Sequence, residues 1–389
     1  MAKALIQPEM VQWARERAGL SRELLAKKIK IKPEQLTTWE SGEDAPTFRQ
    51  AETIAKQTHI PFGYLFLPEP PKEELPIPDL RTRGGVPPEP LGADFFDLIN
   101  DVLYQRDWYK EFLLENGADI LPFVNRFHIT ESVDKIAKDI HKTLELHSLD
   151  TSPTWEEYLD NLYERCEAVG IWIMRSGFIG SNTQRTLSVQ AFRGFTISDA
   201  IVPLIFINGR DAKAAQAFTL AHELAHVWTG NSGISNVNLD DTSMRTNARV
   251  ERTCNAIAAE LLTPKKSFLA AWNDRDGLPG NVDTLSKTFK VSGIVIARRA
   301  MDLGKIGREE FRLFCEQEQR LWQQKEKKGG GNYYRTIPIK HGRQFTNAVL
   351  HSAMSGKLLL REAGALLHMN PAKLPNLLAT TRRSFDVSA

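Results

Sequence analysis

The chain has 389 residues, of which 42% are hydrophobic and 25% are charged, so it is long enough for two or three domains and its composition excludes a disordered or fibrous protein. Fifty basic and 48 acidic residues leave a formal net charge of +2, which by itself indicates neither a nucleic-acid partner nor a membrane surface. Three widely spaced cysteines exclude a disulfide framework, and the lack of a long apolar run or signal-peptide pattern favours a cytoplasmic protein with no membrane partner.

Residues 1–67 show the apolar spacing of short helices. Gly19 ends the first predicted helix, Ser21 caps the second, and Pro33 lies at the start of the third. We expect Pro46 to start a fourth helix. Two short helices joined by a tight turn within such a bundle predict a helix-turn-helix domain.

A proline-rich stretch follows this domain. Five of the twenty prolines lie between positions 68 and 78, and proline cannot continue a helix or a central strand. Residues 68–94 are therefore predicted to form a stiff, extended linker. The apolar spacing of residues 95–150 is helical again.

Residues 151–325 combine helical spacing with strand patterns. Three short apolar runs predict strands: residues 170–174, 189–195 and 204–207. The run KEKKGGG at residues 325–331 predicts a flexible connection, and residues 332–389 predict a small C-terminal segment that is mostly helical. The expected fold class is α+β and mostly helical, with a small sheet in the domain formed by residues 151–325.

The pattern with the clearest chemical meaning is FTLAHELAHVW, at residues 218–228. On a helix, residues four apart share a face, so His222 and His226 can present imidazole nitrogens to one metal ion. Glu223 lies about 100° around the helix from His222, where it can act as a general base on a water molecule held by that ion. The alternative is a buried helix on which both histidines serve only in packing or capping.

A catalytic zinc site uses three protein ligands and a water molecule. Ser232 stands where a third histidine would complete the H-E-x-x-H-x-x-G-x-x-H pattern, so that class of site is excluded. The remaining option is an acidic residue on a later helix. Asp240 and Asp241, in the polar loop before that helix, are two candidates.

The helix predicted to end at Pro264 offers a further candidate for the third ligand. Glu251 and Asn255 lie four apart on one face, so Glu251 can bind the metal while Asn255 accepts the second ring N–H of a ligand histidine. Glu260 falls away from that face and is expected to form a salt bridge or a helix cap. A solvated charge on the helix surface is the alternative for Glu251.

A family resemblance rests on four motifs in a fixed order: FRGF at 192–195, LIFIN at 204–208, FTLAHELAHVW, and VERTCNAIAAELLTP at 250–264. They resemble the ImmA/IrrE family of zinc metallopeptidases over residues 155 to 300. The resemblance implies a zincin-like metallopeptidase domain with one Zn²⁺ per chain. It implies three ligands, His222, His226 and Glu251, with Glu223 as the general base, while Cys254 and Thr263 stand where the family usually has Ala and Met.

The family cleaves helix-turn-helix repressors in bacteria, phages and mobile elements. The resemblance therefore implies an endopeptidase whose protein substrate is a repressor, acting in a stress or defence switch. The rival interpretation is a DNA-binding regulator or antitoxin-like protein whose peptidase-like domain senses a metal or a partner and cleaves nothing.

Residues 1–67 resemble the XRE/Cro class of helix-turn-helix domains. The predicted groove helix offers Lys32, Gln35, Thr37 and Thr38 to DNA, and Arg22 on the preceding helix is placed to meet a phosphate. Residues 1–70 hold ten Lys or Arg and nine Asp or Glu, a balance that argues against tight DNA binding. The alternative is a bundle that docks a substrate repressor or mediates a homodimer.

Overall fold

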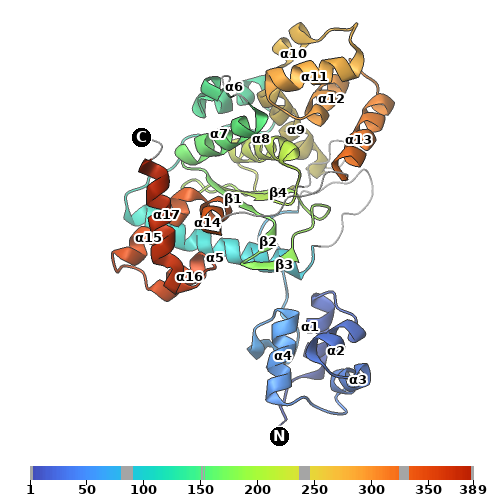
Figure 1. The fold of residues 1–389 in the computed structure, drawn as a ribbon, viewed down its shortest axis with the longest axis vertical. Coiled ribbons are helices and arrows are strands. Elements are labelled where there is room, and N and C mark those ends of the chain that lie inside the picture. The colour runs from blue at the N-terminus through green and yellow to red at the C-terminus, as the bar shows by residue number, and fades with distance from the viewer. Residues whose placement is uncertain are drawn as a thin grey trace. The chain divides into compact units, whose positions relative to one another are not determined.

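The computed structural model describes residues 3–79, 91–149, 152, 154–235, 246–323 and 333–386 (Figure 1). The chain divides into two compact units, one of residues 1–76 and 90–101 and the other of residues 77–89 and 102–389. The α+β, mostly helical class expected from the sequence is confirmed. The boundaries expected at residues 67, 94, 150 and 325–332 remain predictions. Among the described residues, no helix is both long and apolar enough to cross a membrane.

The first unit is a helical bundle. Its elements are α1 (Pro8–Arg17), α2 (Arg22–Ile29), α3 (Pro33–Ser41), α4 (Phe48–Thr58) and the 3₁₀ helix η1 (Phe62–Phe66). Ser21 caps α2 by accepting a hydrogen bond from the backbone of Leu24. The fourth helix begins at Phe48 instead of Pro46, because Thr47 and Gln50 form a reciprocal capping box that fixes the helix start.

The second unit is mostly helical around one small sheet. Its helices before the sheet's last strand are α5 (Ala93–Glu115, whose first residues belong to the first unit), α6 (Val133–Thr143), α7 (Trp155–Ala168) and α8 (Lys213–Thr229). The later helices are α9 (Thr246–Leu262), α10 (Lys265–Ala271), α11 (Gly277–Phe289), α12 (Gly293–Asp302), α13 (Arg308–Gln323), α14 (Tyr333–His341), α15 (Arg343–Met354), α16 (Leu360–Leu366) and α17 (Leu374–Asp386).

The sheet has the strand order β1-β5-β4-β6. Its strands are β1 (Trp172–Ser176), β5 (Leu204–Asn208), β4 (Gly194–Ile197) and β6 (Gly233–Ser235). β1 runs parallel to β5, whereas β4 runs antiparallel to both β5 and β6. A separate hairpin pairs β2 (Phe178–Ile179) with β3 (Asn182–Thr186). The sequence analysis did not predict β2, β3 or β6, which are short or polar.

The predicted strand at residues 189–195 is wrong for most of its length. The strand begins at Gly194, because the preceding residues form a turn in which Ser188 Oγ accepts from the backbone N–H of Ala191. Asn208 also binds this turn, donating from its side chain to the carbonyl of Phe192 and from its backbone to that of Arg193. Short polar side chains that bind the backbone compete with strand pairing in this way.

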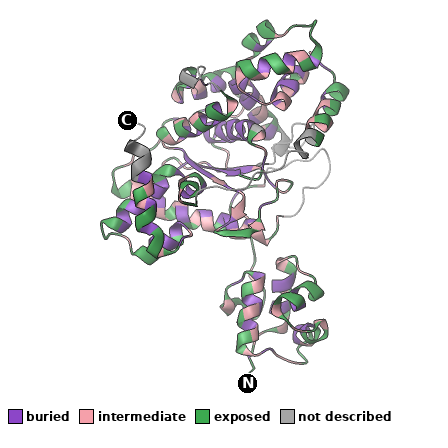
Figure 2. Cartoon of the chain, viewed as in Figure 1, coloured by how far each residue is buried: buried purple, intermediate pink, exposed green. Residues whose placement is uncertain are grey.

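Helix α8 packs against β4 and β5, and α9 packs along α8. Figure 2 shows the strands of this sheet and α8 as the most continuously buried part of the unit. On the β1 side, α14 and α15 cover the sheet, where Trp172 stacks on Phe345 at 4.7 Å between ring centroids. The C-terminal helices therefore share a core with the sheet.

The opposite side of the sheet is extended by part of the expected linker. The backbone N–H of Ile234, on β6, donates to the carbonyl of Pro78 at 3.0 Å, and Asp79 forms a parallel bridge with Ile234. The side chain of Ile77 is buried, with 6% of the residue exposed. Within the expected linker, Pro78 and Asp79 are therefore attached to the sheet, whereas Pro76 and Ile77 form a bend.

Candidate functional site

Helix α8 brings two histidines into the core of the second unit. His222 and His226 are completely buried, and their Nε2 atoms lie 3.0 Å apart. The apolar residues between them, Leu224 and Ala225, are also fully buried, so α8 is enclosed on several sides. The spacing of four residues places both imidazoles on one face, as the sequence predicted.

Helix α9 supplies the acidic partner. Glu251 has 5% of its surface exposed, and its two carboxylate oxygens lie 3.3 Å from His222 Nε2 and 3.1 Å from His226 Nε2. One ligand atom from each of the three residues lies within 4.8 Å of the others. A tetrahedral ion with bonds of about 2.0–2.1 Å has ligand atoms about 3.3 Å apart, so this donor set fits a metal ion of that size.

Two side chains on α9 lie against the histidine rings, and one of them fixes the orientation of His222. Asn255 Oδ1 lies 2.9 Å from His222 Nδ1 and accepts its N–H, which leaves Nε2 facing Glu251. Cys254 lies beside His226 and raises the pKa of its imidazole. The sequence analysis had anticipated the contact of Asn255, but it had assigned Cys254 only to the apolar face of the helix.

Burial and mutual attraction determine the charges of this cluster. Burial would raise the pKa of Glu251, but the nearby imidazoles of His222 and His226 lower it to about 2. Burial would likewise lower the pKa of His226, but Cys254 and Glu251 raise it to about 10. The carboxylate and the two imidazoles therefore stabilise one another's charged forms.

Glu223 lies beside this cluster and contacts the sheet. Its Oε2 accepts a hydrogen bond of 2.6 Å from the hydroxyl of Thr196 on β4, and both residues are completely buried. Its Oε1 is buried and has no hydrogen-bond partner among the described residues. Burial raises the pKa of Glu223, with the two histidines opposing the shift. A carboxylate held by one oxygen and free at the other can accept a proton from a water molecule.

Gly194 makes room for this carboxylate. A Cβ atom at Gly194 would lie 2.9 Å from Glu223 Oε1 and 3.0 Å from the carbonyl oxygen of Phe206. The sequence analysis named neither Gly194 nor Thr196 as a site residue. The available signal was a small and a polar residue two apart in a strand that is otherwise apolar, because such residues share one face of the strand.

The other acidic candidates lie elsewhere. Glu260 forms an ion pair with Arg299, as expected. Asp240 and Asp241 lie outside the described residues. Ser232, at the position of a third histidine in the excluded pattern, accepts a hydrogen bond of 2.9 Å from the backbone of Ser198.

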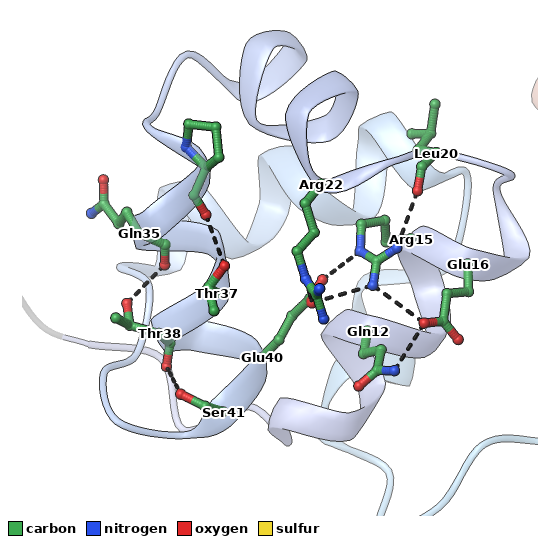
Figure 3. Close-up of polar contacts among 11 residues, drawn as sticks. Gln12, Arg15, Glu16, Leu20, Arg22, Gln35, Thr37, Thr38, Glu40 and Ser41 are labelled. Atoms are coloured by element: carbon green, nitrogen blue, oxygen red, sulfur yellow. Dashed lines mark hydrogen bonds and ion pairs between the residues drawn. The ribbon is translucent and has the colours of Figure 1, made fainter.

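In the first unit, Arg22 is already engaged within the protein (Figure 3). Its Nε atom donates to Glu40 Oε2 at 2.6 Å, and Glu40 also receives Nε of Arg15 at 2.5 Å. The side chain of Glu40 is 3% exposed, whereas that of Arg22 is 45% exposed. Arg22 therefore helps to neutralise a buried carboxylate while part of its side chain faces solvent.

The other four residues predicted to contact DNA belong to α3 or directly precede it. Lys32, Gln35 and Thr37 are exposed, and Thr38 is half-buried. The hydroxyl of Thr37 donates to the carbonyl of Pro33, and that of Thr38 donates to the carbonyl of Gln35 (Figure 3). Both threonine hydroxyls therefore bind their own helix, and Lys32 and Gln35 are the longest exposed side chains of the set.

Comparison with known families assigns three parts of the chain. Residues 166–301 match the IrrE N-terminal-like domain, which is a peptidase family, and residues 11–65 match a helix-turn-helix family of DNA-binding domains. The chain has the ImmA/IrrE architecture. Residues 341–380 match a domain of unknown function. No curated protein and no solved structure matches the chain.

This architecture agrees with the geometry of the site. The three candidate ligands and Glu223 all lie within the matched peptidase domain, which belongs to a metal-dependent family. The second unit therefore carries a metallopeptidase-like domain, and the first carries a helix-turn-helix.

Proposed function

We propose that the protein is a zinc-dependent endopeptidase that cleaves a partner protein. The observation that carries this proposal is the convergence of His222, His226 and Glu251, with ligand atoms 3.0–3.3 Å apart, beside a carboxylate with one free oxygen. A binding site for a metal ion needs only the first three residues. Glu223 adds the group that hydrolysis requires.

The chemistry follows from the positions of these side chains. A zinc ion held by the three ligands would supply Lewis acidity, which polarises a peptide carbonyl and acidifies water. Glu223 Oε1 accepts a proton from the attacking water and later returns it to the leaving amine. Thr196 holds the other carboxylate oxygen through this cycle, so the group that exchanges the proton keeps its direction.

The substrate that we propose is a helix-turn-helix repressor. Support comes from the combination of domains in one chain. The peptidase domain would cleave the repressor, and the helix-turn-helix domain would bind the same repressor or its DNA. The first unit binds DNA or docks the repressor, and it can also bring two copies of the chain together. Cleavage would relieve repression in a stress or defence switch.

The test compares the wild-type protein with Glu223→Gln and with Glu115→Gln, a matched change at an exposed glutamate. Zinc content is measured by elemental analysis, and cleavage is measured with purified repressors encoded near this gene. We expect Glu223→Gln to keep its zinc and to lose about 10²–10⁴-fold in rate, because an amide cannot accept the proton. Glu115→Gln should behave like the wild type. Cleavage by Glu223→Gln at the wild-type rate would overturn the proposal.

A second candidate is a DNA-binding regulator whose peptidase-like domain senses a metal and cleaves nothing. The observation in its favour is burial, since His222, Glu223 and His226 are completely buried and Glu251 is 5% exposed. Undiminished regulation in cells that carry Glu223→Gln, with metal still bound, would favour this second function.

A further inference from the structure

The C-terminal helices (Figure 1) contain a turn that is also found in the first unit. In the first unit, α2 is followed by Lys30, which has a φ of 60°, and Pro33 begins α3 three residues later. In the second unit, α16 is followed by His368, which has a φ of 48°. Three residues later, Pro371 begins the 3₁₀ helix η3 (Pro371–Lys373), which leads directly into α17. Left-handed backbone is uncommon at residues other than glycine, so the two turns share a specific feature.

The hydrogen bonds of the two turns also correspond. The backbone N–H of Ile31 donates to the carbonyl of Ala26 at 3.0 Å, and that of Met369 donates to the carbonyl of Gly364 at 2.9 Å. In both turns the acceptor is a small residue five positions before the donor. A Cβ atom at Gly364 would lie 2.8 Å from the carbonyl oxygen of Met369, so the second turn packs closely against α16.

The helices after the two turns bury equivalent positions. Six and nine residues after the left-handed residue stand Leu36 and Trp39 in α3, and Leu374 and Leu377 in α17. All four are at most 2% exposed. The pair α16 and α17 therefore shares with α2 and α3 the turn and the buried positions of a helix-turn-helix.

The two regions differ in charge. Residues 332–389 hold eight Lys or Arg and two Asp or Glu, whereas residues 1–70 hold ten and nine. Counted from the turn, Ala372 and Lys373 stand in the places of Glu34 and Gln35, so the second pair lacks the acidic residue of the first. Lys373 is exposed and lies over the ring of Tyr333, and no carboxylate among the described residues pairs with it. An excess of positive charge is what binding to DNA phosphates requires.

We propose that α16 and α17 form a second helix-turn-helix that binds double-stranded DNA, with the start of α17 in the major groove. Asn376, in the place of Thr38, is exposed and is positioned to read a base edge, as asparagine does with adenine. Lys373 and the exposed Arg361 on α16 are positioned to contact phosphates. This site is separate from the first unit, and it does not depend on the proposed cleavage.

The turn itself is attached to the rest of the second unit. His368 Nε2 lies 3.2 Å from Gln105 Nε2 on α5, and the carbonyl of His368 accepts a hydrogen bond from the hydroxyl of Ser181. DNA at α17 is therefore held by the same compact unit that carries the candidate metal site.

The first experiment measures binding of fluorescent duplexes of random sequence to the full-length protein. Lys32→Ala with Gln35→Ala removes the two longest exposed side chains predicted to contact DNA in the first unit, and we expect this background to keep binding. Adding Lys373→Ala should lower affinity about tenfold at about 50 mM salt and reduce the slope of log affinity against log salt by about one. Adding Lys287→Ala, a matched change at an exposed lysine on α11, should change neither quantity.

The second experiment tests sequence reading by Asn376. Preferred duplexes are selected with the same background protein, and each base pair of the selected site is then changed in turn. We expect Asn376→Ala to lose about five- to 150-fold discrimination at one base pair and to keep its discrimination at the others. The urea midpoint of each variant checks that the exposed substitutions leave the fold unchanged.

The outcomes decide the proposal whatever the peptidase assay shows. A background protein that binds no duplex at about 50 mM salt, or one whose affinity is the same with and without Lys373→Ala, would overturn it. Equal affinity for duplex and single-stranded DNA would exclude α17 as a helix that reads the major groove. Loss of cleavage in every preparation, with DNA binding still sensitive to Lys373→Ala, would remove the proposed function and leave the second helix-turn-helix in place.

Discussion

Thr196→Val tests whether the hydroxyl on β4 directs Glu223. Valine has nearly the same shape as threonine, so the completely buried strand should keep its packing while the 2.6 Å hydrogen bond to Glu223 Oε2 is lost. A hydrogen bond to a charged group contributes about 1.5–3 kcal/mol. If this contribution is present only when the carboxylate is correctly directed, kcat should fall about ten- to 150-fold.

The assay is steady-state cleavage of the repressor substrate, with zinc content measured on the same samples. We expect kcat to fall in Thr196→Val while zinc content stays at the wild-type value, because the Thr196 hydroxyl donates to Glu223 and to none of the three candidate ligands. Thr196→Ser restores a hydroxyl at this place and should recover most of kcat. A kcat for Thr196→Val equal to that of the wild type, or a serine variant as slow as the valine variant, would refute this reasoning.

Four further variants test other parts of the structure. Glu251→Ala removes one of three candidate ligands and should bring zinc occupancy near zero, so full occupancy by elemental analysis would exclude Glu251 as a ligand. Asn255→Leu removes the acceptor of the His222 N–H and should weaken zinc binding about 10–100-fold in a chelator competition, and an unchanged affinity would contradict that role. If Arg22 contacts a phosphate, Arg22→Ala should lower by about one the slope of log DNA affinity against log salt concentration. An unchanged slope would show that Arg22 pairs with Glu40 and contacts no phosphate. Burial and the charge of Lys340 hold the pKa of His341 well below its usual value, so its stabilising contribution is present above about pH 6.5 and is lost as the pH falls below it. Urea unfolding at pH 7.5 and 5.5 should therefore show a smaller acid loss in His341→Leu than in the wild type, by at most about 1.4 kcal/mol per pH unit, and equal losses would contradict the assignment.

The parts of the site that lie on helices were predictable from the sequence. His222 and His226 are four residues apart, as are Glu251 and Asn255, and a helix places such pairs on one face whatever surrounds them. The sequence also predicted that Glu260 would leave that face. What it could not predict was that α8 and α9 pack with the two faces toward each other, because this contact depends on the whole core.

The contacts that sheet pairing creates were not predicted. Thr196 and Gly194 meet Glu223 only because β4 lies beneath α8, and the start of β4 was itself misplaced by a turn that Asn208 stabilises from a neighbouring strand. The bridge between Asp79 and Ile234 on β6 joins positions more than 150 residues apart, and no local sequence pattern predicts it. The ion pair between Arg22 and Glu40 was also not predicted, because it depends on how separate helices of the small bundle pack together.

The two functions of the site belong to different elements. The three metal ligands come from α8 and α9, whereas the residues that hold Glu223 come from β4. Substitutions on α9 should therefore change metal content first, and substitutions on β4 should change turnover at constant metal content. A loss of direction would then alter kcat, and a loss of ligands would alter zinc content, so the two measurements distinguish the two parts of one site.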